Sequence, residues 1–317
     1  MKYFKKRTIL LLIAVFCTIL VAISLWLHLY DFKKWQYFNR YSFENLKSIK
    51  KVDQIDPMLV PNFFHYEGQR LACLAKYVQN FDDTKIGWIS DIHADKFKRR
   101  TVDSGTIYPK RYGEYLNKVF DDLSDEGIYT VISTGDNTNT SGSDYARNIE
   151  IIAQEKCMNV IWVKGNHDNS AVMNELGVFG NLQYYFTDQG NVRIIAINNV
   201  EPFKDGNKYF GGVDDTQLEW LSSVLKTDKR IIIAMHIPIF PLNLEDVVLD
   251  EYAKMENILH DNKNVKMVLS GHFHIPWQKK YNGINYYGEG ALSYQGSEGA
   301  YAIINLNDFS IDYKFSK

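Results

Sequence analysis

The chain has 317 residues, of which 45% are hydrophobic and 23% are charged, a composition typical of folded globular proteins and not of disordered chains. Its net charge is -2, and residues 30–317 alone hold 32 basic and 38 acidic residues. A domain of that sign lacks the basic face that duplex nucleic acid requires, which excludes DNA and RNA as expected partners.

An apolar segment covers residues 9–29, which contain no Asp, Glu, Lys or Arg. In a helix, these 21 residues span about 30 Å, the thickness of the hydrocarbon core of a bilayer. Basic residues at positions 5–7 precede the segment, and such residues mark the cytoplasmic side of a membrane span. We therefore expect a cytoplasmic N-terminus (residues 1–8), a single-pass anchor (9–29) and a remainder outside the plasma membrane. A cleavable signal peptide or a buried helix of a soluble domain are the alternatives.

The membrane-proximal segment, residues 30–84, is rich in aromatic residues and is not of low complexity, so we do not expect a flexible linker there. Apolar residues at the spacing i, i+3, i+4, i+7 predict a packed helix near its end; they are Leu71, Leu74, Ala75 and Val78.

The three cysteines match no metal-binding or redox motif. Cys17 lies in the apolar segment, whereas Cys73 and Cys157 are far apart in the chain. In an exported domain Cys73 and Cys157 are able to form a disulfide, but the sequence does not report their separation in space.

Six short apolar runs follow residue 84, and each ends in polar residues; they cover residues 85–90, 129–134, 159–164, 193–197, 230–235 and 265–270. Their content of Val, Ile and aromatic residues predicts strands buried on both faces. Residues 112–123 and 214–225 have helical periodicity, and Asp214 is a typical N-cap. This alternation predicts an α/β domain over residues 85–317. Three C-terminal segments without intervening helices predict a strand meander joined to a sheet; they are residues 284–294, 299–306 and 309–315.

Residue types that commonly bind metals follow five of these runs: Asp91 and His93, Asp136 and Asn139, Asn166, His167 and Asp168, His236, and His272 with His274. Sheets of α/β domains bind ligands beyond the carboxyl ends of their strands, so these side chains are expected to converge. His272 and His274 are two residues apart and share a face of an extended backbone. Alone, each group is more often a turn, a helix cap or a hydrogen-bonded surface histidine, but five in succession favour one metal site.

The motif order D-x-H, G-D-x-x-N, G-N-H-D, H and G-H-x-H resembles that of the calcineurin-like metallophosphoesterases, a superfamily of dinuclear-metal phosphatases and phosphodiesterases. The motifs begin at Asp91, Gly135, Gly165, His236 and Gly271, and the resemblance covers about residues 85–317. It implies a four-layer αββα sandwich of two mixed β-sheets flanked by helices, to which this chain adds the expected N-terminal transmembrane helix.

The resemblance also implies roles for individual residues. One metal would be held by Asp91, His93, Asp136 and His274, and the other by Asp136, Asn166, His236 and His272. His167 would be the catalytic group that gives a proton or hydrogen bond to the leaving oxygen. Asn139 and Asp168 would hold neighbouring site residues in position without binding metal themselves, with Asp168 orienting His167.

These residue types suit two adjacent cations. A carboxylate shared by both ions partly offsets their mutual repulsion, and neutral amide and imidazole ligands preserve the positive charge that attracts phosphate. Mixed His, Asn and Asp ligation suits manganese, iron, zinc or nickel, so the sequence leaves the identity of the two metals open.

Two differences from known branches of the superfamily indicate which branches the chain resembles. The protein serine/threonine phosphatases carry an arginine soon after the G-D motif and a single terminal histidine, whereas this chain has GDNTNTSG and GHFH. These differences favour the phosphodiesterase-like and acid-phosphatase-like branches. Residues 137–140 also contain no tyrosine, which argues against the iron-tyrosinate centre of purple acid phosphatases.

We therefore expect a membrane-anchored phosphoesterase that hydrolyses phosphomonoesters or phosphodiesters by attack of a metal-bridging hydroxide. Its substrate would be a small phosphorylated molecule such as a nucleotide, a lipid headgroup or an envelope phosphate. Residues 172–186 and 237–254 follow two of the motifs and are expected at the pocket rim or in the core. The alternative is a catalytically silent, metal-stabilised surface protein that binds a partner through its aromatic membrane-proximal segment.

Overall fold

The computed structural model describes residues 73, 82–102, 105–178, 183–200, 211–241, 248–296 and 298–316, all within the unit Ala72–Lys317. The predicted cytoplasmic residues 1–8 and anchor 9–29 lie outside the described residues, as does most of the segment 30–84 with its predicted helix. Among the residues that are described, no helix has both the length and the apolar character needed to cross a bilayer.

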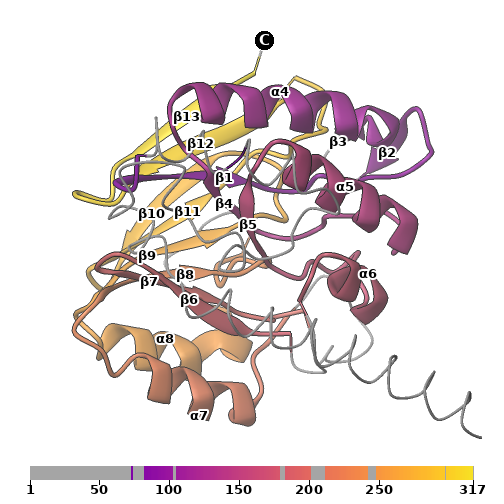
Figure 1. Ribbon diagram of the computed structural model, residues 1–317. Helices are drawn as coiled ribbons and strands as arrows, with labels where there is room; N and C mark the ends of the chain where they lie inside the picture. Colours follow the sequence, from indigo (N-terminus) through magenta and orange to yellow (C-terminus); the bar gives the residue numbers. More distant parts are fainter. Residues whose placement is uncertain are drawn as a thin grey trace, which may run out of the picture. The chain divides into compact units, whose positions relative to one another are not determined.

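A five-stranded mixed sheet has the strand order β13-β12-β1-β4-β5 (Figure 1). Its strands are β1 (Lys85–Ile89), β4 (Thr130–Ser133), β5 (Asn159–Trp162), β12 (Ala300–Asn305) and β13 (Ile311–Phe315). β1, β4 and β5 run parallel, while β12 is antiparallel to both of its neighbours. The carboxyl ends of β1, β4 and β5 therefore meet at one edge of this sheet.

A six-stranded mixed sheet has the order β10-β11-β9-β8-β7-β6. Its strands are β6 (Tyr185–Gln189), β7 (Val192–Ala196), β8 (Arg230–Ala234), β9 (Val265–Ser270), β10 (Trp277–Tyr281) and β11 (Ile284–Gly288). The central strands β7, β8, β9 and β11 are parallel, and antiparallel β6 and β10 close the two edges. All six strands predicted from apolar runs are present in the two sheets.

The two sheets pack face to face, and helices cover their outer faces (Figure 1). The helices are α4 (Tyr112–Asp125), α5 (Ser143–Glu155), α6 (Ser170–Glu175), α7 (Asp215–Val224) and α8 (Ala253–His260), with short 3-10 turns at η3 (Pro109–Arg111) and η5 (Asp250–Tyr252). α4 lies on the five-stranded sheet, where Gly87 leaves room for the side chain of Leu123. α7 begins as predicted, because the Asp214 carboxylate accepts a hydrogen bond from the backbone N–H of Gln217 at 2.7 Å.

Two apolar cores hold these layers together. Between the sheets, Trp88 and Ile132 of one pack against Ile194, Ile232 and Met267 of the other. A second core joins the six-stranded sheet to α7 and α8; its members include Ile195, Ile231, Ile233, Leu218, Leu221, Met255 and Leu259. Adjacent residues of one strand therefore enter different cores, which explains why these strands are continuous apolar runs.

Cys73 and Cys157 form a disulfide with a Cα–Cα distance of 5.4 Å. Cys157 follows the C-terminus of α5, so the bond fixes Cys73 against this part of the domain. The disulfide closes a loop across a sequence separation of 84 residues. The possibility that the sequence left open is thus realised in the structure.

The C-terminal strands do not form the single meander that the sequence suggested. β11 joins the six-stranded sheet parallel to β9, while β12 pairs with β1 in the five-stranded sheet and β13 follows it. Strands that follow one another along the chain thus belong to different sheets, because β11 pairs with a parallel strand of one sheet and β12 pairs with β1 of the other. β2 (Arg100–Val102) and β3 (Gly105–Ile107) form a separate small hairpin.

Candidate metal centre

The predicted ligands lie in five loops that leave parallel strands of the two sheets. Each loop reaches its first such residue two to four positions after its strand ends; these residues are Asp91, Asp136, Asn166, His236 and His272. Backbone hydrogen bonds continue between the loops, from His93 N–H to the carbonyl of Asp136 at 2.8 Å and from Gly271 N–H to that of His236 at 3.0 Å. The loops are therefore held together in the same order as the strands they follow.

Five of the predicted ligand residues have a left-handed backbone, with φ between 49° and 69°; they are Asp91, His93, Asp136, His272 and His274. Such a conformation costs a residue other than glycine about 1–2 kcal/mol. Strain of this kind is concentrated at functional sites, where the surrounding structure must compensate for it. Close packing is part of that surrounding structure, because a Cβ at Gly165 would collide with the backbone nitrogen of Asp136, and one at Gly271 with the Ser90 hydroxyl.

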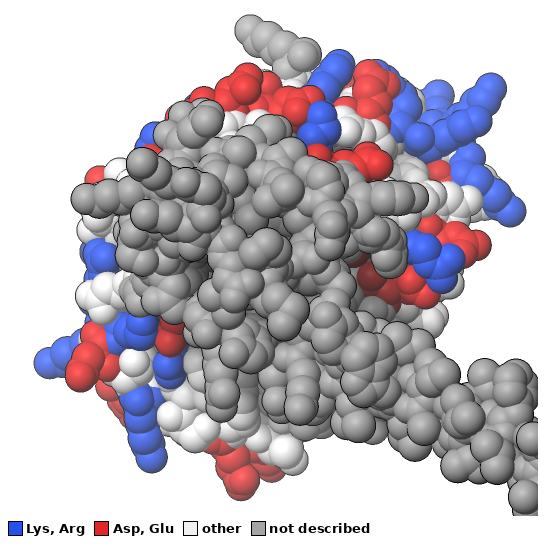
Figure 2. All heavy atoms as spheres, in the orientation of Figure 1, with Lys and Arg blue, Asp and Glu red and all other residues white. Residues whose placement is uncertain are grey.

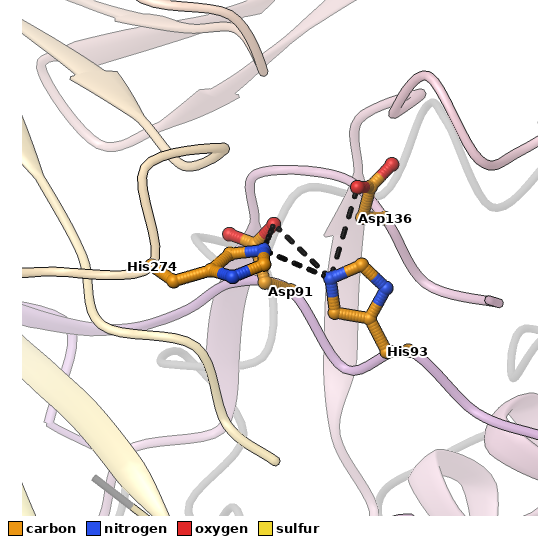
Figure 3. A group of neighbouring side chains, drawn as sticks. All are labelled: Asp91, His93, Asp136 and His274. Atoms are coloured by element: carbon orange, nitrogen blue, oxygen red, sulfur yellow. Dashed lines mark hydrogen bonds and ion pairs between the residues drawn. The ribbon is translucent and has the colours of Figure 1, made fainter. Parts of the chain in front are cut away.

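One group of potential ligands consists of Asp91, His93, Asp136 and His274, all of them buried. In Figure 3 the Nε2 atom of His93 points toward the other three side chains. It lies 3.0 Å from His274 Nε2, 3.7 Å from Asp91 Oδ1 and 3.8 Å from Asp136 Oδ2. His274 Nε2 is 3.3 Å from Asp91 Oδ1. Two nitrogens and two carboxylate oxygens thus converge on one point.

A second group consists of Asp136, His236 and His272, so Asp136 belongs to both groups. His236 Nε2 lies 3.4 Å from Asp136 Oδ2 and 2.9 Å from the side-chain oxygen of Asn166. The other ring nitrogen, Nδ1, is 2.8 Å from the carbonyl oxygen of Thr134, which orients the imidazole. The rings of His236 and His272 pack edge to face with centroids 5.1 Å apart.

The residues present fit a pair of bound cations. Within the described residues Asp91 Oδ1 is buried without a hydrogen-bond partner, although Oδ2 accepts hydrogen bonds from Ser90 Oγ at 2.6 Å and from His272 N–H at 3.1 Å. A buried carboxylate oxygen without a partner is costly, and here it faces two imidazole nitrogens. A cation would satisfy all three atoms, and mixed carboxylate, imidazole and amide donors suit divalent transition metals.

Burial and neighbouring charges set the protonation of this site. Burial lowers the pKa of His93 to about 3 and that of His272 to about 4. Although burial acts in the opposite direction, the charge of His274 holds the pKa of Asp91 at about 2, and that of His236 holds the pKa of Asp136 well below its ordinary value. At neutral pH the two carboxylates are therefore ionised while His93 and His272 are neutral, the states in which these groups bind metals.

His236 differs from the other two histidines. Although burial lowers its pKa, the adjacent carboxylate of Asp136 raises it to about 9. An imidazolium and a carboxylate in contact balance each other's charge when no cation is present. A cation bound by Asp136 would take over that role and favour the neutral ring.

His167 lies beside both groups without belonging to either. Its Nδ1 atom is 2.8 Å from the carbonyl oxygen of Asn139, and its Nε2 atom is 3.9 Å from Asp136 Oδ2. Its backbone N–H donates to Asp136 Oδ1 at 2.8 Å. The side chain is 16% exposed. A carbonyl oxygen has no hydrogen to donate, so Nδ1 carries the hydrogen of this bond, and Nε2 faces the metal centre.

Asp168 accepts hydrogen bonds from backbone N–H groups and from the side chains of Asn137 and Thr138, and not from the imidazole of His167. Its carboxylate accepts hydrogen bonds from the N–H groups of Gly165, Asn137 and Thr138 at 3.0, 3.1 and 2.9 Å. It thereby ties the turn that carries Asn166 and His167 to the loop that carries Asp136. The ring of His167 is oriented instead by Asn139, through its backbone carbonyl.

Asp95 is a residue that the sequence analysis did not single out. It is 2% exposed, and its carboxylate binds the side chains of Asn139 and Thr140. The available signal was its place in DIHAD, where Asp91, His93 and Asp95 alternate. That signal was not sufficient, because an alternating Asp is equally typical of a turn.

The two segments considered for the pocket rim contribute largely to the core where they are described. Val172 and Met173 are buried in α6, and the hydroxyl of Tyr185 donates to the carbonyl of Trp162 at 3.0 Å. Ile239 and Phe240 belong to the core beneath the six-stranded sheet. Residues 179–182 and 242–247 of these segments lie outside the described residues.

Comparisons with known proteins identify a family and a fold that the chain shares. A family model described as calcineurin-like phosphoesterase matches residues 84–276. A manganese-dependent ADP-ribose/CDP-alcohol diphosphatase of Arabidopsis thaliana is 39% identical over 72 residues, which are 21% of this chain and 23% of that protein. A probable cyclic nucleotide phosphodiesterase of a Pseudoalteromonas species is 26% identical over 72% of this chain and 92% of its own length. The crystal structure of a dimetal phosphatase from Danio rerio shares the fold, with a TM-score of 0.59 and 16% identity over 72% of this chain and 93% of that one.

Proposed function

Because the chain belongs to the calcineurin-like phosphoesterase family, we propose that it is a dinuclear metal-dependent phosphodiesterase that acts on small phosphorylated molecules. The observation that carries this proposal is the position of Asp136, whose carboxylate belongs to both groups of potential ligands. Two cations held by one shared carboxylate form the arrangement that clamps a phosphate ester for in-line displacement.

The ligand sets follow from the two groups. One ion would be held by Asp91, His93, Asp136 and His274, and the other by Asp136, Asn166, His236 and His272. Asn166 enters the second set because its side-chain oxygen lies beside His236 Nε2, at 2.9 Å. When bound, the two ions supply an activated water and neutralise negative charge on the phosphate.

His167 would supply the proton at the leaving oxygen from Nε2–H of its doubly protonated ring, and would be left with the hydrogen on Nδ1. Its Nδ1–H is engaged by the carbonyl of Asn139, so only Nε2 is directed to the space in front of the shared carboxylate. The side chain is partly accessible to solvent, as are those of Asn166 and His272, which is expected where groups meet substrate. A positioned general acid of this kind contributes about 10²- to 10⁴-fold to the rate.

Two features support a small anionic diester as the substrate. The Pseudoalteromonas relative, which this chain covers over most of its length, is named a probable cyclic nucleotide phosphodiesterase. In addition, Lys and Arg side chains gather over the β2–β3 hairpin and the start of α4 in Figure 2. Lys98, Lys110 and Arg111 line a surface cavity of about 530 Å³ there, together with Glu114, whose carboxylate pairs with Arg111. A positive surface near the motif that begins at Asp91 raises the local concentration of phosphorylated substrate.

We also propose that the catalytic domain lies outside the cytoplasm and is tethered to the plasma membrane by residues 9–29. The apolar segment and the basic residues before it support this topology. The disulfide between Cys73 and Cys157 supports it independently, because such bonds persist in oxidising compartments. Protease treatment of intact cells should digest the domain, and its protection until the cells are lysed would refute this topology.

The activity is tested with the full-length protein in detergent, supplied with manganese. Bis-p-nitrophenyl phosphate, p-nitrophenyl phosphate and cyclic nucleotides are compared at equal metal loading. We expect turnover of the diesters with a kcat/KM above that of the monoester. Faster turnover of the monoester would show that the protein is a phosphatase and not a diesterase. An absence of turnover on all substrates, with both metals bound, would favour the catalytically silent binding protein.

A further inference from the structure

Asp95 is a buried carboxylate whose hydrogen bonds all lie within the protein. Oδ2 accepts from Asn139 Nδ2 at 3.1 Å and from Thr140 Oγ1 at 2.7 Å, and Oδ1 accepts from the backbone N–H of Lys96 at 2.6 Å. Neither group of potential metal ligands formed by the described residues includes Asp95. Its carboxylate is therefore engaged with the loop after β4 and not with the metal centre.

The loop that Asp95 holds is the one that orients His167. Asn139 places its carbonyl oxygen 2.8 Å from His167 Nδ1, and the hydroxyl of Ser141 donates to the backbone carbonyl of His167 at 2.7 Å. The backbone of Asn139 is fixed in turn by its N–H, which donates to the carbonyl of Ala94 at 3.1 Å. Asp95 and His167 are thus linked through a single residue, Asn139.

The side chain of Asn139 depends on Asp95 for its position. Its Oδ1 atom is buried without a hydrogen-bond partner among the described residues, whereas its Nδ2 atom donates to Asp95. Loss of the Asp95 carboxylate would leave both ends of this buried amide unsatisfied. A buried polar group without partners costs about 1–3 kcal/mol, so the loop would rearrange to satisfy it and would carry the Asn139 carbonyl with it.

We propose that Asp95 is a positioning residue for His167, acting through Asn139 and Thr140 to keep Nε2 directed at the leaving oxygen. This inference rests on the proposed function, because it assumes that His167 donates the proton. It assigns Asp95 no contact with metal or substrate. A change at Asp95 should therefore affect proton delivery and leave metal binding unchanged.

The test uses full-length protein loaded with manganese and a series of aryl phosphodiesters whose leaving phenols differ in acidity. Asp95→Ala should lower kcat by about tenfold for the least acidic phenols and by less than about threefold for p-nitrophenol, which needs little protonation. Metal content should stay at the wild-type level. A uniform loss across the series, or a loss of metal, would show a structural role and overturn the proposal.

Epistasis gives the decisive comparison. In a His167→Ala background Asp95→Ala should have no further effect on kcat, because the group that it positions is absent. Multiplicative effects of the two substitutions would overturn the proposal. If Asp95→Ala does not fold, Asp95→Asn and Thr140→Val take its place in the same double-mutant cycle with His167→Ala, since each removes only part of the contact. An absence of diester turnover by the metal-loaded wild type would refute the proposed function, and a fully active His167→Ala protein would refute the role of His167 as proton donor. A slow His167→Ala protein with a wild-type Asp95→Ala protein would refute only the positioning role.

Discussion

Replacement of Cys73 by serine is expected to destabilise the domain strongly. The disulfide to Cys157 closes a loop across 84 residues, and in the chain-entropy model a loop of this length restricts the unfolded chain by about 4.5 kcal/mol at 25 °C. For a domain of this size, a loss of that magnitude lowers the melting temperature by roughly 9–18 °C. Thermal unfolding of the full-length protein in detergent, followed by circular dichroism, measures the shift.

Matched variants separate the bond from the side chains. Cys157→Ser and the double variant should match Cys73→Ser, because breaking the bond from either side has the same effect. Cys17→Ser should melt at the wild-type temperature, since Cys17 belongs to the apolar segment near the N-terminus. Reductant should lower the melting temperature of the wild type but not that of the double variant. Equal melting temperatures for wild type and double variant would refute the reasoning.

Four further outcomes are expected. Asp136→Asn should lose both metals and all measurable activity together, as seen by elemental analysis, because its carboxylate belongs to both ligand groups. His167→Ala should keep its metals and lose about 10²- to 10⁴-fold in kcat. Burial raises the pKa of Glu150 from its ordinary 4.5 to about 7, so the folded state loses stability as pH rises through that interval. Glu150→Gln should therefore raise the free energy of unfolding at pH 8 by about 1–3 kcal/mol and change it little at pH 4. The double substitution Lys98→Glu and Lys110→Glu should lower kcat/KM about threefold or more at low salt. It should have little effect at about 0.5 M salt, where the charges are screened.

The lysine substitutions have a control, and the other outcomes have results that would contradict them. Lys226→Glu changes an exposed cation that precedes β8, whereas His236 follows the carboxyl end of that strand, so it should leave kcat/KM unchanged. Metal loss from His167→Ala would indicate that His167 is a ligand. Full metal content in Asp136→Asn would show that the Asp136 carboxylate is not needed to hold the metals. A Glu150→Gln variant less stable than wild type at pH 8 would contradict the raised pKa.

Much of the fold could be predicted because its signals are local. Each predicted strand is a largely buried run rich in Val, Ile and aromatic residues, β7, β8 and β9 enter an apolar core on both faces, and α7 begins at its predicted N-cap, Asp214. The placement of the C-terminal strands could not be predicted in this way. Nothing local in β11 or β12 names a partner strand, and only pairing with β9 or β1 assigns each to its sheet.

The sequence by itself determined the chemical types at the metal centre and their order along the chain, because each ligand residue follows its own strand within a few positions. It also determined that parallel strands would carry these residues to a common edge. Only the tertiary structure decided which atoms meet there: that Cys73 reaches Cys157, that Asn139 and not Asp168 orients the ring of His167, and that Asp95 holds Asn139 across 44 residues. These contacts join different loops, and the direction of a side chain in a loop depends on strand register and on packing with residues distant in the chain, which no local spacing encodes.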